Sequence, residues 1–215
     1  ISLSVGILKF NVINCNELYN QCKILQMIKR NIFLLFFIFS CSQKTIIPVS
    51  IYTELGPIAL DLYPHMAPIT VNNFLKYLDE DRYKDFHFYR VVNLNNQPEN
   101  DIKIEVIQGG LGFNKHDQEL ESIPHETTEV TRLKHLNGTI SMARMEPGTA
   151  SSEIFICIND QPELDFGGLR NPDGYGFAAF GRVSSGMEVV KQIQALPSIQ
   201  QMLNTVVRVD SIIKN

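Results

Sequence analysis

Short strand-like runs, separated by turns rich in glycine and proline, recur along this chain from residue 49 almost to its end. Only two segments, 64–78 and 187–196, have apolar residues at the three- and four-residue spacing that predicts an amphipathic helix. Many short strands with few helices favour a closed β-barrel, because closure removes exposed strand edges, although the pattern alone also allows a sandwich. The runs are 49–54, 57–62, 86–92, 102–107, 139–143, 154–158, 177–183 and 206–213.

Four blocks of the sequence carry a more specific signal. In residues 137–157, two predicted strands flank a turn rich in proline, glycine and serine, which alone indicates an exposed loop between paired strands. Together, and in this order, the blocks resemble the cyclophilins, the cyclosporin-type peptidyl-prolyl cis/trans isomerases. The resemblance covers roughly Val49 to Ile213. The blocks are Phe88–Val92, Val106–Gly110, Asn137–Cys157 and Phe177–Val190.

This resemblance implies both a fold and an activity. The fold would be mostly β, a closed eight-stranded antiparallel β-barrel capped by two α-helices, and it would occupy residues 49–215. The activity would be the isomerisation of X-Pro peptide bonds, which uses no cofactor and no metal. The four cysteines and five histidines agree with the lack of a metal, because none of them shows zinc-ligand spacing.

The chemistry of this reaction requires few groups. Rotation about an X-Pro bond breaks amide resonance, and its uncatalysed barrier is about 20 kcal/mol. A site must hold the proline ring in an apolar pocket and hydrogen-bond the twisted amide, whose nitrogen gains a lone pair. A fixed donor with a permanent charge stabilises the twisted state more than the planar one, and the planar guanidinium of arginine suits that role.

Arg90 matches the position of the family's catalytic arginine. On spacing alone, an ordinary surface arginine on a strand would be the better interpretation, so the catalytic role depends on the resemblance. Gln108 matches the glutamine that binds the substrate backbone, and strand alternation puts Val106 on the same face. Phe155 would be the floor of the proline pocket; without the resemblance it would count as a core residue. The other implied substrate-binding positions are Ala143, Arg144, Glu153, Leu164 and Phe177.

Several departures from the family pattern bear on activity. Eighteen positions separate Arg90 from Gln108 where the family usually has eight, and the extra residues lie in 93–101 and its flank. Glu105 stands where an apolar pocket residue is usual, and Glu153 replaces a glutamine that helps to hold the peptide. We expect these carboxylates to draw Arg90 into a salt bridge that competes with its catalytic role.

Three functions follow as alternatives. The first is an active isomerase that helps exported proteins to fold, with proline-containing polypeptides as substrates and a monomeric enzyme. The second is a low-activity proline-peptide binding module or chaperone with the same barrel, which the two carboxylates favour because fold does not guarantee activity. The third is a structural barrel that contacts a partner through the 93–101 insertion.

The segment before the barrel has the pattern of a secretory signal. Residues 27–40 combine a basic start with a short apolar run, about half the roughly 20 residues of a transmembrane helix. Ser40-Cys41 resembles the cleavage box of bacterial lipoproteins, so we expect lipidation of Cys41, a tether over 41–48 and a protein anchored in the bacterial cell envelope. Translation would then start at Met27, with 1–26 as upstream sequence. Ordinary secretion and a buried core segment are the alternatives.

The charge balance gives no sign of other partners. The net charge of −4 does not predict nucleic-acid binding, and a lipid anchor would be the sole link to a membrane. Cys157 lies in an apolar run, which indicates a buried thiol rather than a nucleophile.

Overall fold

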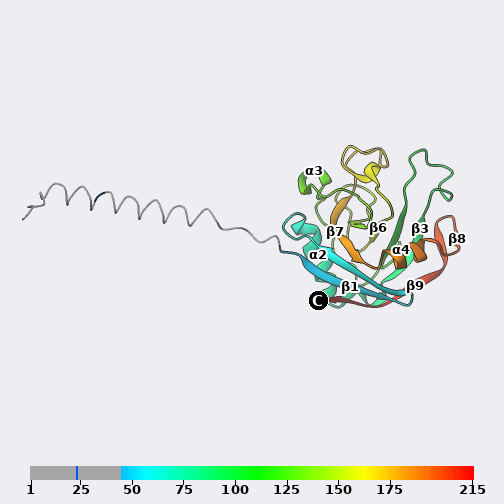
Figure 1. The fold of residues 1–215 in the computed structure, drawn as a ribbon, viewed down its shortest axis with the longest axis horizontal. Coiled ribbons are helices and arrows are strands. Elements are labelled where there is room, and N and C mark those ends of the chain that lie inside the picture. The colour runs from blue at the N-terminus through cyan, green and yellow to red at the C-terminus, as the bar shows by residue number, and fades with distance from the viewer. Residues whose placement is uncertain (1–22, 24–44) are drawn as a thin grey trace, which may run out of the picture. The chain divides into compact units, whose positions relative to one another are not determined.

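The computed structural model describes Lys23 and residues 45–215, and the second range contains the barrel (Figure 1). Its helices are α2 (Pro68–Asp79), α3 (Thr128–Thr131) and α4 (Met187–Gln194), with two short 3-10 helices, η1 (Arg82–Asp85) and η2 (Pro162–Leu164). Its strands are β1 (Ile47–Thr53), β2 (Gly56–Leu62), β3 (His87–Val92), β4 (Val106–Gly110), β5 (Thr139–Met142), β6 (Ile154–Cys157), β7 (Ala178–Ser185), β8 (Ser198–Ile199) and β9 (Met202–Lys214).

Eight of the strands form a closed antiparallel barrel. Neighbouring strands run in the order β1-β2-β7-β5-β6-β4-β3-β9, and β9 pairs again with β1 to complete the circle. The blue β1 accordingly lies between the cyan β2 and the red β9 in Figure 1. The two-residue β8 adds only a hairpin to β9. This closure confirms the predicted eight-stranded barrel and excludes the sandwich, because the barrel wall has no free edge.

The interior of the barrel is filled by alternate strand residues. In β1, for example, Val49 and Ile51 have no exposed surface, as expected when successive side chains point to opposite faces. The apolar stripe of α2, which includes Val71 and Phe74, packs into the same core, as does Val190 from α4. Pro68 begins α2, where its missing N–H removes no helical bond.

Helix α3 is a single turn of helix within the long segment 111–136. With it, the barrel carries three α-helices rather than two. Among the boundaries that differ from expectation, α2 begins at Pro68 rather than at residue 64, and β9 begins at Met202 rather than at residue 206.

The strand expected over residues 102–107 begins only at Val106 and continues to Gly110. The buried side chain of Gln97 explains this shift. Its amide donates to the carbonyl of Ile104 at 2.8 Å and accepts the N–H of Ile104 at 3.3 Å. The Ile104 backbone therefore bonds to a side chain where a strand would bond to a neighbour, and the segment forms a loop.

Among the described residues, no helix is both long and apolar enough to cross a membrane. The predicted signal peptide at 27–40 and the lipidation site at Cys41 lie outside the described residues.

Candidate active site

Arg90 and Gln108 lie opposite each other on the paired strands β3 and β4. Arg90 donates from Nη1 to Oε1 of Gln108 at 2.6 Å. It also donates from Nε and Nη2 to Oε1 of Gln201, at 3.1 and 2.5 Å. Both partners are neutral amides, so the guanidinium is held in one orientation while its charge stays uncompensated.

Gln201 reaches Arg90 from the tight turn between β8 and β9. Gln200 and Gln201 have φ values of 48° and 75°, in the left-handed region that glycine and asparagine usually occupy in such hairpins. The Gln201 amide also donates to the carbonyl of Asn96 at 3.1 Å. One side chain thus connects Arg90 to the 93–101 insertion. The sequence offered no signal for it, because a Gln-Gln pair is not a recognisable turn.

The predicted salt bridge between Arg90 and the two new carboxylates does not form. Glu105 accepts a hydrogen bond from Nδ2 of Asn159 at 2.8 Å. Glu153 accepts the N–H of Gly112 at 2.9 Å and the hydroxyl of Tyr89. Each carboxylate already has hydrogen-bond donors of its own, so that prediction was wrong.

Glu153 instead supports the orientation of Gln108. The Tyr89 hydroxyl, which donates to Glu153, accepts a hydrogen bond from Nε2 of Gln108 at 2.9 Å. That contact leaves Oε1 of Gln108 to accept from Arg90. Burial raises the pKa of the Glu153 carboxyl, and burial together with Glu153 raises the pKa of Tyr89. A four-residue chain, Glu153-Tyr89-Gln108-Arg90, therefore connects the buried carboxyl to the guanidinium.

Beside Arg90 lies a small cavity of about 180 Å³, in which apolar side chains form one part of the wall and arginine and amide side chains form the other. Phe155 is 4% exposed, and the Phe177 ring meets it edge to face with centroids 5.2 Å apart. Ile104, the neighbour of Glu105, also lines this cavity. The predicted residues that line this cavity are Arg90, Val106, Gln108, Arg144, Phe155, Leu164 and Phe177.

Ala143 and Glu153 line an adjoining cavity of about 450 Å³, which also shares Arg90, Gln108 and Arg144. All nine predicted site residues therefore line one or both of two cavities that share three lining residues. The residues that sequence reasoning missed are Gln201, Ile104 and Arg170, none of which stands in the four motif blocks.

Arg144 is a wall residue whose charge is already neutralised. Its guanidinium forms a two-point ion pair with Asp173, at 2.8 and 2.9 Å, and donates to the carbonyl of Gly176. The same group lies 5.2 Å from the centre of the Phe177 ring. Hydrogen bonding to Arg144 lowers the pKa of Asp173. Arg144 thus supports the aromatic wall of the first cavity.

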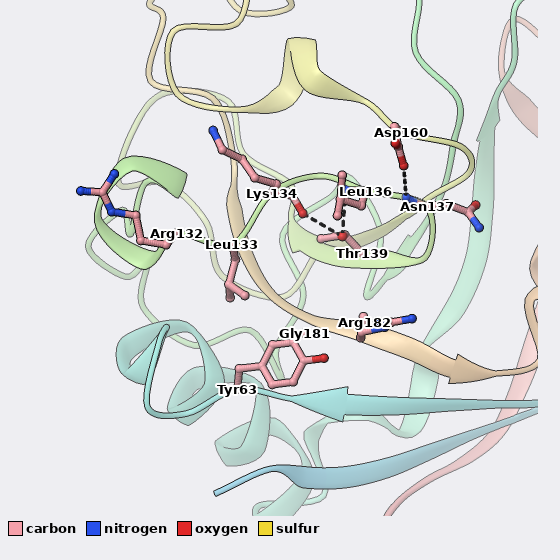
Figure 2. Close-up of a pocket in the computed structure, with 10 residues that line it drawn as sticks. All are labelled: Tyr63, Arg132, Leu133, Lys134, Leu136, Asn137, Thr139, Asp160, Gly181 and Arg182. Atoms are coloured by element: carbon pink, nitrogen blue, oxygen red, sulfur yellow. Dashed lines mark hydrogen bonds between the residues drawn. The ribbon is translucent and has the colours of Figure 1, made fainter. Parts of the chain in front are cut away.

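A separate cavity of about 410 Å³ contains none of the predicted site residues. Figure 2 shows Tyr63, which follows β2, facing Arg182 on β7, with Asn137 and Asp160 beyond them. The N–H of Asn137 donates to Asp160 at 2.9 Å, and Thr139 donates to the carbonyl of Lys134. This cavity contains neither Arg90 nor the aromatic pair Phe155 and Phe177, so it is not the site that the motif blocks predict.

The described residues offer neither a metal site nor an activated thiol. Within residues 45–215, no group of three or more histidine, cysteine, aspartate or glutamate residues could hold a metal ion. Cys157 is fully buried, and burial raises the pKa of its thiol well above the usual range. The thiol is therefore protonated and shielded from solvent at neutral pH.

Comparison with known proteins agrees with this geometry. Residues 48–214 match the family model "Cyclophilin type peptidyl-prolyl cis-trans isomerase/CLD". The chain is 34% identical to peptidyl-prolyl cis-trans isomerase cyp18 of Streptomyces antibioticus over 150 residues, 69% of this chain and 83% of that protein. It is also 34% identical to isomerase B of Escherichia coli over 152 residues, 69% of this chain and 84% of that protein.

A solved structure shows the same fold. A cyclophilin type isomerase of Cryptosporidium parvum, crystallised in the presence of the dipeptide Ala-Pro, matches with a TM-score of 0.62 and 21% identity. The match covers 78% of this chain and 98% of that one. With a family match over most of its length and relatives at 34% identity, this chain belongs to the cyclophilin-type peptidyl-prolyl cis/trans isomerases.

Proposed function

We propose that this isomerase uses Arg90 to stabilise the twisted X-Pro amide while the 180 Å³ cavity holds the proline ring. The observation that carries the proposal is the setting of the guanidinium. It is fixed by Gln108 and Gln201, has no carboxylate partner among residues 45–215, and lines the same cavity as the Phe155 and Phe177 rings. A fixed charge of this kind interacts most strongly with the lone pair that appears on the prolyl nitrogen when resonance is lost.

Each surrounding residue has a defined part in this proposal. Phe155, Leu164 and Val106 supply the apolar surface for the ring. Gln108 is oriented by Tyr89 and can bond the peptide backbone next to the proline. No proton is transferred and no covalent bond is formed, so neither a nucleophile nor a metal has a place in the reaction.

An isomerisation assay tests the activity directly. The full chain should accelerate the cis-to-trans conversion of a short X-Pro peptide, which takes tens of seconds or longer without a catalyst. Peptide binding without any acceleration would support the binding module instead. The two carboxylates favoured that module in the sequence, but in the structure neither Glu105 nor Glu153 forms an ion pair with Arg90.

We further propose that the enzyme acts on exported proteins, as a monomer anchored in the bacterial cell envelope through acyl chains on Cys41. The basic start at Met27, the apolar run that follows it and the Ser40-Cys41 box support this proposal. Membrane attachment would hold the barrel where newly exported chains fold.

Processing at Cys41 gives a testable prediction. Mass spectrometry of the protein purified from membranes should find a chain that begins at an acylated Cys41. Cys41→Ser should release the protein from the membrane, because removal of the acyl chains removes the anchor. The control Cys157→Ala, at the other cysteine of the proposed mature chain, should leave attachment unchanged. An unmodified chain that begins before Met27 would contradict the proposal.

A further inference from the structure

Two loops at the active site are joined by hydrogen bonds. One is the segment 93–105 between β3 and β4, which contains the 93–101 insertion, and the other is the 165–176 loop before β7. We call the two loops together the site rim. In Figure 1 both loops, one green and one yellow, rise from the same side of the barrel. Arg170 joins them by donating from Nη1 to Oε1 of Gln97 at 2.9 Å and to the carbonyl of Ile102 at 2.5 Å.

The contact between Arg170 and Gln97 belongs to a buried hydrogen-bond network and is not an isolated contact on the surface. Gln97 is 1% exposed, and its amide bonds the backbone of Ile104 and the carbonyl of Asn93. Arg170 itself lines the 180 Å³ cavity, together with Arg90 and Ile104. The rim therefore brings a second guanidinium to the pocket that the proline ring would occupy.

The charge of Arg170 has no counterion within residues 45–215. All its hydrogen-bond partners are neutral, as are those of Arg90, whereas the third arginine of the cavity, Arg144, is paired with Asp173. Burial lowers the pKa of Arg170, and burial followed by repulsion from Arg170 lowers the pKa of Arg90. Two uncompensated positive charges thus border one partly dehydrated cavity, where an anion would be stabilised.

We propose that Arg170 is a specificity-determining residue that binds a carboxylate on a residue adjacent to the substrate proline. The inference rests on the proposed function, because it takes the 180 Å³ cavity as the site of the proline ring. Consecutive Cα atoms are about 3.8 Å apart, so a side chain next to that proline comes within reach of the cavity wall. The planar guanidinium of Arg170 matches a carboxylate in shape as well as charge.

The test compares matched peptides that differ in one charge. One pair of short X-Pro peptides has Glu or Gln before the proline, and a second pair has Glu or Gln after it. Comparing the two pairs identifies the side of the proline on which Arg170 binds the carboxylate. We expect kcat/KM to be about tenfold higher for Glu than for Gln on one side, the effect of one charge-assisted hydrogen bond. Higher salt should reduce this preference.

Variants separate recognition from a purely structural role. Arg170→Gln should bring the Glu-to-Gln ratio close to one, and Arg170→Lys should keep part of the preference. Arg132→Gln, which removes an exposed charge at the cavity of Figure 2, should keep the whole preference. Arg170→Gln could instead lower kcat/KM equally for the Glu and Gln peptides and leave their ratio unchanged. Arg170 would then only hold the two loops together, and the proposal would be overturned.

Two other outcomes are equally informative. A wild-type ratio near one on both sides of the proline would refute the recognition of a carboxylate. If the wild type turned over no peptide, the proposed activity would fail, but calorimetric binding of the same peptide pairs would still test the preference. A tighter Kd for Glu that disappears in Arg170→Gln would support the inference without turnover, and equal Kd values would reject it.

Discussion

Arg90→Ala should lower kcat/KM for a neutral X-Pro peptide by about 10²–10³, the usual effect of losing one preorganised donor. The large size follows from the geometry: two glutamine side chains hold the guanidinium at the edge of the pocket before any substrate arrives. The loss should appear in kcat rather than in KM, because a donor to the twisted nitrogen acts mainly in the transition state. Protease-free isomerisation kinetics measure both constants.

Two further variants make this result specific. Arg90→Lys should not restore the rate, because a point charge cannot bond Gln108 and Gln201 at once. Arg182→Ala, the loss of an exposed strand arginine on β7, should leave the rate unchanged. Wild-type kinetics from Arg90→Ala would refute the assignment of Arg90.

Phe155→Ala should reduce the free energy of unfolding by about 3–5 kcal/mol and weaken proline-peptide binding as well. The ring is 4% exposed, packs with Leu164 and Val106, and is stacked beneath the His135 ring at 5.9 Å. Its removal would leave a cavity in a cluster that is both part of the core and the floor of the pocket. Denaturant titration gives the first quantity and peptide titration gives the second.

Phe113→Ala is the matched control for stability. Phe113 is 63% exposed, so the loss of its ring should change the free energy of unfolding by less than about 1 kcal/mol. A Phe155→Ala protein with unchanged stability and unchanged peptide affinity would place Phe155 outside both the core and the site.

Local sequence patterns were sufficient for most of the strands and for the two longer helices. Both patterns depend only on residues close in the sequence. In Val49–Thr53 the side chains alternate across the strand, and in α2 the apolar residues recur at three and four positions because a helix repeats every 3.6 residues. Alternation could not distinguish a barrel from a sandwich. That choice depends on the pairing of β1 with β9, at opposite ends of the described barrel sequence.

The same division applies to the site. The motif blocks located Arg90, Gln108 and Phe155, which the fold brings to one cavity, since family positions on paired strands keep their register. The hydrogen-bond and ion-pair partners of the charged residues in that cavity could not be predicted from the sequence. The sequence indicated an acidic competitor for Arg90, but Glu105 lies against Asn159 and Glu153 is directed to Tyr89.

The contacts that orient and charge the pocket join residues far apart in the chain. Gln201 meets Arg90 across 111 positions, and Arg170 meets Gln97 across 73. Neither pair has a local pattern, because hydrogen bonds between side chains of distant loops depend on where the barrel places each loop. The sequence by itself therefore determined most strands and the two longer helices by periodicity, and its motif blocks predicted the barrel and the main candidate site residues. Only the tertiary structure decided which neutral partners hold Arg90, and that a second unpaired arginine stands beside it.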